Sequence, residues 1–155
     1  MSAKSKAAVA AVVAVLLAIP GVPWVLGIRK ISVGADGLEV TDAFPYDAWD
    51  AVLARVVGRD GQVAYTDLAA DSGDFRRFVA TLATVGPTTR PELFADPNAS
   101  RAWHINAYNA VTLLGIVDNW PNTGVHDISG PLNPKDGFGF FYGLRFELDG
   151  KWTNT

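Results

Sequence analysis

The pattern of apolar and polar positions divides the chain near residue 30. Residues 7–28 form a run of 22 residues without a charge, AAVAAVVAVLLAIPGVPWVLGI. A helix of about 20 apolar residues crosses the roughly 30 Å hydrocarbon core of a bilayer. The run therefore predicts a transmembrane helix, with a kink or an early end near Ile19 because Pro20 and Pro23 each lack a backbone donor.

A cleaved signal peptide is the main alternative for this segment, and a buried core helix is a third. Lys4 and Lys6 precede the apolar stretch as in a signal, but no small-x-small cleavage triplet follows Ile19. We expect residues 1–30 to be a retained anchor. The signal-like layout places residues 31–155 outside the cytoplasm, so we expect a single-pass membrane protein or, after cleavage, a secreted or periplasmic one.

Helical spacing of apolar residues recurs three times after residue 44. Residues 31–44 contain an Asp36-Gly37 turn and are predicted to be a linker or a short strand. Three helices and one short strand are expected to follow, from the positions of apolar residues, caps and breakers. The predicted ranges are a helix from Pro45 to Gly58, a strand over Gln62–Tyr65, a helix from Ser72 to Gly86, and a helix from Asn98 to Asn119.

Strict alternation replaces helical spacing after residue 139. Phe140, Tyr142 and Leu144 are predicted to share the buried face of a strand that runs to Leu148. Asp149-Gly150 then predicts a two-residue hairpin turn, and residues 151–155 begin the return strand. Together the elements predict one α+β domain over residues 45–155, preceded by the linker 31–44 and the segment 1–30.

Composition narrows the classes of function. Residues 31–155 carry nine basic and 16 acidic side chains, a net charge of −7. This balance argues against nucleic-acid binding, because phosphate neutralisation supplies most of that affinity. The chain has no cysteine, and its two histidines have no metal-ligand spacing. Gly137-Phe138-Gly139 has no helix after it to cradle a phosphate. We therefore expect neither a metal nor a cofactor.

Polar residues on the longest predicted helix are the first candidates for a site. At 100° per residue, Asn106 and Asn109 fall on one stripe with Leu113 and Ile116. Buried amides need hydrogen-bond partners. They either clamp the backbone of a neighbouring loop or, with the phenol of Tyr108, line a substrate pocket.

The segment 121–139, rich in Gly and Pro, is predicted to be a long loop at the edge of a binding cleft. It contains His126 and Asp127, which join Tyr108 as weak catalytic candidates. Adjacent side chains diverge, so His126 would need a remote carboxylate to act as a general base. No serine has the context of an activated nucleophile.

One stretch resembles a known family. The residues RAWHINAYNA from Arg101 to Ala110, with Trp120-Pro121 downstream, resemble the central helix of the domain of unknown function 547 family, and GQVAY at Gly61–Tyr65 resembles its preceding strand. The resemblance covers residues 45–155 and singles out the polar motif residues Asn106, Tyr108, Asn109 and Tyr65. It implies the domain topology and frequent export in bacterial members, but no settled reaction. The family's later His- and Cys-bearing segments have no counterpart before Thr155.

Two hypotheses for the function follow. The first is a membrane-tethered extracytoplasmic module, held in the membrane through residues 7–28, that acts by non-catalytic binding or in envelope assembly. Its partner would be an envelope protein or a small molecule. The second is a truncated hydrolase-like enzyme whose catalytic residues lie beyond Thr155.

Overall fold

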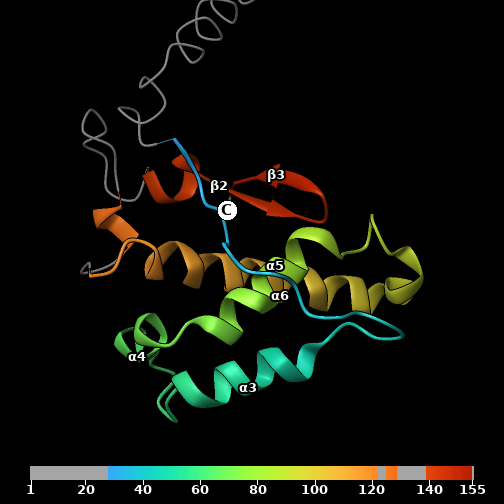
Figure 1. Cartoon of the computed structure of the whole chain (residues 1–155), viewed down its shortest axis with the longest axis horizontal. Coiled ribbons are helices and arrows are strands. Elements are labelled where there is room, and N and C mark those ends of the chain that lie inside the picture. Colours follow the sequence, from blue (N-terminus) through green and yellow to red (C-terminus); the bar gives the residue numbers. More distant parts are fainter. Residues whose placement is uncertain (1–27, 122–124, 129–138, 155) are drawn as a thin grey trace, which may run out of the picture.

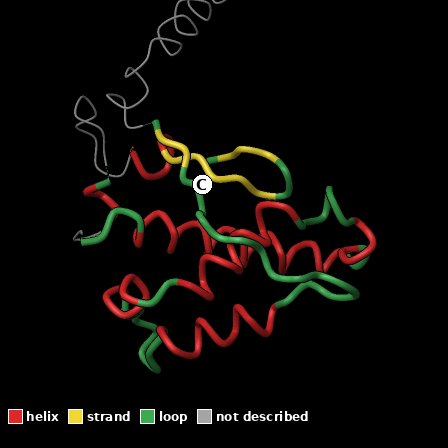
Figure 2. The backbone as a smooth tube through the Cα atoms, viewed as in Figure 1, coloured by secondary structure: helices red, strands yellow, loops and turns green. Residues whose placement is uncertain are grey.

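A computed structural model describes residues 28–121, 125–128 and 139–154. These residues form an α+β fold with several helices and one small sheet, which confirms the predicted fold class (Figures 1 and 2). The α-helices among them are α3 (Tyr46–Val56), α4 (Tyr65–Ala70), α5 (Gly73–Thr84) and α6 (Pro97–Val117). Three shorter helical turns are η1 (Pro91–Phe94), η2 (Val125–Asp127) and η3 (Gly139–Gly143).

The sheet has the strand order β1-β2-β3. Strand β1 (Arg29–Lys30) runs parallel to β2 (Leu144–Leu148), and β3 (Lys151–Thr153) runs antiparallel to it. The predicted hairpin at Asp149-Gly150 is confirmed. Both turn residues have positive φ, 51° and 74°, which matches the twist of a two-residue hairpin and explains why Asp-Gly occupies it.

The core lies between α3 on one side and the sheet on the other, with α5 and α6 in the middle (Figure 1). Helix α5 contacts α3, α6 and β2. The indole of Trp49 stacks on the ring of Phe78 with centroids 5.0 Å apart and planes 9° from parallel. Both side chains are almost fully buried, and each removes a large apolar surface from water.

The segment predicted to be a linker or short strand takes part in this core. Ile31 and Phe44 are buried, and the Phe44 ring lies 5.8 Å from that of Phe78. Arg29 and Lys30, which the sequence places at the end of the anchor, form β1. The predicted span over residues 7–28 lies outside the described residues except for Ile28. Within the described part, no helix has the length and apolar character to cross a membrane.

The predicted strand over Gln62–Tyr65 is wrong in its extent. Val63 makes an isolated antiparallel bridge with Val57, and Tyr65 already begins α4. The bridge forms where the chain reverses after α3, since Gly58 N–H donates to the carbonyl of Gln62 at 2.8 Å. The chain then coils because α4 buries Leu68 completely, which an extended strand in this place would not do.

The strand predicted over residues 140–148 is shorter in the structure: β2 begins at Leu144, four residues later than expected. Residues 139–143 form the π-helical turn η3, so Tyr142 is 61% exposed instead of sharing the face of Phe140 and Leu144. The cause is a close approach at Gly115 on α6. A Cβ on Gly115 would lie 2.7 Å from Phe140 Cε2 and 3.2 Å from Leu144 Cδ1. The coiled backbone brings both side chains to this one glycine.

The predicted stripe of α6 is wrong in the first half of the helix and confirmed in the second. Leu113 and Ile116 of the stripe are buried, but Asn109 is exposed. In the first half, Trp103 and Ala107 are at most 3% exposed and form the buried face instead. Apolar residues occupy several faces of this helix, so periodicity alone did not decide which face is buried.

Candidate functional site

Asn106 is the one polar motif residue on α6 that makes a buried tertiary contact. Its Oδ1 accepts a hydrogen bond from Trp49 Nε1 at 3.1 Å. Trp49 is 1% exposed, and its indole N–H has no route to water. The amide therefore satisfies a buried donor of α3 and ties α3 to α6. The expected clamp exists, but its partner is a side chain and not loop backbone.

The other motif residues point to different places. Tyr108 is 50% exposed and Asn109 is exposed, so the prediction that Asn109 is buried is wrong. Tyr65 stacks on Trp120 at the far end of α6, with ring centroids 5.9 Å apart. The four residues singled out by the motif therefore do not converge on one pocket.

The two histidines of the chain, His104 and His126, lie on different elements, α6 and η2. His126 is exposed on η2, and Asp127 lies next to it in the same turn. His104 Nδ1 lies 2.7 Å from the carbonyl oxygen of Ser100, one turn earlier on α6. In the described residues, no three carboxylate or imidazole groups gather in a way that could hold a metal ion. Most of the predicted 121–139 loop lies outside the described part.

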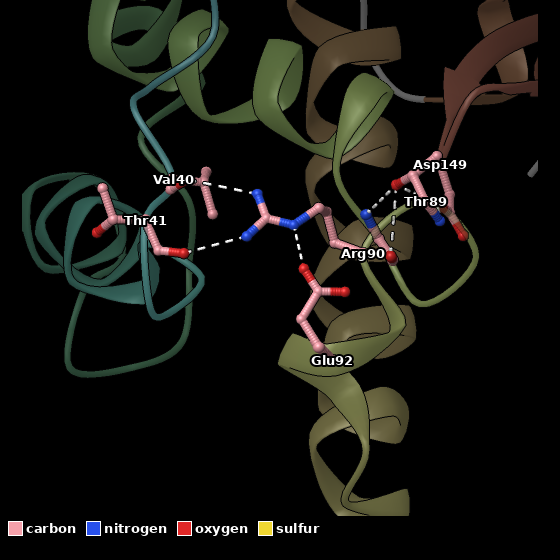
Figure 3. A network of polar contacts seen from close by, with 7 residues as sticks. Val40, Thr41, Thr89, Arg90, Glu92 and Asp149 are labelled. Atoms are coloured by element: carbon pink, nitrogen blue, oxygen red, sulfur yellow. Dashed lines mark hydrogen bonds and ion pairs between the residues drawn. The ribbon is translucent and has the colours of Figure 1, made fainter.

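The densest polar cluster of the described chain surrounds a residue that the sequence predicted only as part of a turn. The Asp149 carboxylate accepts hydrogen bonds from Thr88 N at 2.6 Å, Thr89 N at 2.8 Å and Thr89 Oγ1 at 2.7 Å (Figure 3). Its own N–H donates to the carbonyl of Leu82. Burial by itself would raise the pKa of Asp149, but the bonds from Thr88 and Thr89 outweigh it and hold the pKa below the usual range.

Arg90 extends this cluster toward the segment before α3. Its guanidinium donates to the carbonyl oxygens of Thr41 at 3.1 Å and Val40 at 3.5 Å, and it pairs with Glu92 (Figure 3). The contact with Arg90 lowers the pKa of Glu92. The cluster fastens the hairpin turn, the loop after α5 and residues 40–41 together. It serves architecture, since its polar atoms are used by one another.

Space for a ligand lies beside β1. A cavity of about 570 Å³ is bounded by residues 30–37, by α5 and by the hairpin. Its charged and aromatic lining residues are Lys30, Asp36, Glu147 and Trp152. Lys30 Nζ lies 4.5 Å above the centre of the Trp152 ring, and this indole is 42% exposed. A smaller cavity of about 330 Å³ lies between α3 and α5, where Arg55 and Asp74 face it.

The sequence pattern indicates neither this cavity nor the Asp149 cluster. Glu147 and Trp152 are partners across the β2–β3 hairpin, but Lys30 lies more than 100 positions before them and meets them only because β1 pairs with β2. No local spacing rule connects Lys30 with the hairpin. The one available signal was the Asp149-Gly150 dipeptide, which marks the turn but not what its carboxylate binds.

Comparison with known proteins found no relative of this chain. A scan against protein-family models gave no match, and neither a search of curated proteins nor one of solved structures returned a match. The function is therefore to be sought in the chain's own residues.

Proposed function

We propose that this chain is a membrane-tethered module that binds an envelope component outside the cytoplasm. One observation carries the proposal. The 22-residue uncharged run ends at Ile28, and the first strand of the folded domain begins at Arg29. Lys4 and Lys6 before the run suit an N-terminus on the cytoplasmic side.

The basic pair after the run supports a tight connection between span and domain. Arg29 Nη2 donates to Asn119 Oδ1 at the end of α6, and Lys30 lies over Trp152. Ile31 N–H donates to the carbonyl of Arg145 at 2.8 Å. Three successive residues are thus held by the domain, so no flexible spacer separates it from the run.

The cavity beside β1 is the binding site in this proposal. Its lining comprises residues 30–37 together with one indole, one cation and the two carboxylates of Asp36 and Glu147. This mixture suits an extended polypeptide segment, which presents backbone hydrogen-bonding groups together with side chains of both charges. We therefore assign an envelope protein as the partner in preference to a small apolar molecule.

Single-cysteine labelling tests the anchor and its orientation, because the chain has no cysteine of its own. Ser5→Cys and the exposed Gln62→Cys are expressed in spheroplasts and treated with a membrane-impermeant maleimide. We expect labelling of Gln62→Cys in intact spheroplasts, labelling of Ser5→Cys only after lysis, and retention in the membrane after alkaline carbonate extraction. A soluble species lighter by about 2–3 kDa would show a cleaved signal and contradict the anchor.

A random peptide library tests the cavity. Peptides selected on the full chain in nanodiscs are expected to lose binding to Trp152→Ser and Glu147→Lys. They should keep binding to the control Ile105→Ser, which changes an exposed residue of α6 outside the cavity. Peptides that bind all variants equally would contradict this site.

We also propose membership of the domain of unknown function 547 family, on the strength of the motif at Arg101–Ala110. The support is local: these residues lie within the continuous helix α6, and Trp120-Pro121 follows its end. An experimentally determined structure of a family member should show the order α3-α4-α5-α6-hairpin, with the motif on its longest helix. A different order of elements would exclude membership.

A further inference from the structure

Three chain segments meet at the end of the sheet where β1 and β2 begin, here called the amino end. Because β1 and β2 are parallel with Arg29 opposite Leu144, the turn η3 lies beside Ile28. Arg29 binds Asn119, which brings the end of α6 to the same place. Figure 1 shows η3, β1 and the end of α6 at this side of the molecule.

The amino end carries an aromatic surface. Tyr142 is 61% exposed, and Phe141 and Trp120 are half-buried. Phe141 lies edge-on against Phe140 at 5.1 Å, whereas Trp120 stacks on Tyr65 of α4 at 5.9 Å. We call the two residues of η3, Phe141 and Tyr142, the amino-end surface.

The position of this surface relative to the uncharged run selects a lipid partner. The run of 22 residues is long enough to cross a hydrocarbon core of about 30 Å, and it stays uncharged through Pro20 and Pro23 up to Ile28. If the run spans the bilayer, its last uncharged residue, Ile28, lies at the level of the headgroups. Residues that pair beside Arg29 then lie within the interfacial layer, which is roughly 5–7 Å deep on each side. Trp and Tyr are enriched at that depth because their rings are apolar and their tips are polar.

We infer that the amino-end surface of Phe141 and Tyr142 lies in the lipid headgroup layer and holds the domain in one orientation on the bilayer. The inference rests on the proposed anchor. The domain is fastened at two points, the covalent connection at Ile28 and the aromatic contact of η3. It does not swing on a tether, and the cavity beside β1 keeps a constant direction relative to the membrane.

The test compares two exposed positions with a fluorophore attached to a single cysteine. Tyr142→Cys reports on the amino-end surface. Ile105→Cys is the matched control, since Ile105 is 56% exposed and lies 14 residues before Asn119 on the same helix, about 21 Å along its axis. The full chains, labelled with an environment-sensitive dye, are reconstituted into phosphatidylcholine–phosphatidylglycerol vesicles.

We expect a headgroup spin-labelled lipid to remove most of the emission at position 142 and little at position 105, and aqueous iodide to do the reverse. Iodide quenching that is equal at both positions in chains that float with the vesicles would overturn the inference and leave the anchor intact. Strong lipid quenching at both positions would also overturn it, because contact would not be confined to this surface. Chains that do not float would instead refute the proposed anchor.

Discussion

The two ends of the small sheet are built from different chemistry. At the turn end, the Asp149 carboxylate is 9% exposed and accepts three hydrogen bonds from Thr88 and Thr89. At the amino end, aromatic rings dominate: Phe140 is fully buried, and Tyr142 beside it is 61% exposed. Polar atoms at the turn end are used within the fold, whereas the amino end presents apolar surface outward.

This difference separates architecture from a surface that can bind. A buried carboxylate with a full set of donors specifies how the hairpin docks and leaves no bond for a ligand. A half-exposed aromatic group adds little to the fold at its outer face and keeps area for a partner. The turn end should therefore respond to substitution through stability, and the outer amino end through association.

The largest loss of stability is expected from a change in the buried part of the amino end. Phe140→Ala removes a fully buried ring that packs against Gly115, and it should lower the free energy of unfolding by about 3–5 kcal/mol. Tyr142→Ala, two residues away, should stay within about 0.5 kcal/mol. Urea unfolding of residues 29–155 with and without each change measures both. Similar losses for the two variants would show that η3 does not divide an inner from an outer face.

Asp149→Asn tests the turn end. Asparagine tolerates the positive φ but loses the charge, so we expect a loss of about 1.5–3 kcal/mol at pH 7. Because the folded pKa of Asp149 is lowered, its contribution is complete above the unfolded value of about 3.9 and disappears as the pH falls through the folded pKa.

Urea titrations of both proteins across this pH range should therefore converge in acid. A constant difference between wild type and Asp149→Asn down to the lowest pH would mean that the carboxylate charge does not contribute to docking of the hairpin.

Two asparagines on α6, which connects the two ends, give the smallest contrast. Asn106→Leu leaves the buried Trp49 indole N–H without an acceptor and should cost about 1–3 kcal/mol. Asn109→Leu changes an exposed side chain and should stay within about 0.5 kcal/mol. Thermal unfolding of the two variants measures the contrast. A large loss at Asn109 would restore the predicted stripe and contradict the observed face of α6.

Local signals predicted the helices α3, α5 and α6 with small boundary errors but missed the short helix α4. Pro45 precedes α3, Ser72 precedes α5, and the third helix was placed within one residue of its observed start. These positions depend on backbone chemistry within a few residues, such as a missing N–H or an Asp cap, and are legible without tertiary contacts. The start of α5 shows the limit of such local signals. Ser72 occupies the cap position but makes no capping hydrogen bond, and its hydroxyl accepts a hydrogen bond from Arg76 Nε instead.

The candidate site was less predictable than the elements. Asn106 was expected to be buried and bonded; it is half-buried and bonded, and its partner lies 57 positions away on α3. Arg76 pairs with Asp118, 42 positions away, and donates to the carbonyl of Val33, 43 positions away. For both residues, the type of side chain indicated a hydrogen bond, but only the tertiary structure determined its partner.

The sequence by itself determined the uncharged run, the three helices α3, α5 and α6, and the hairpin turn, because each depends on composition or on neighbours within one or two turns. The tertiary structure decided which face of α6 is buried, where β2 begins and what meets at each end of the sheet. Those outcomes depend on contacts between distant segments, such as Phe140 with Gly115 and Asp149 with Thr89. Close packing and the pairing of buried polar atoms select among faces that the helical period alone leaves equivalent.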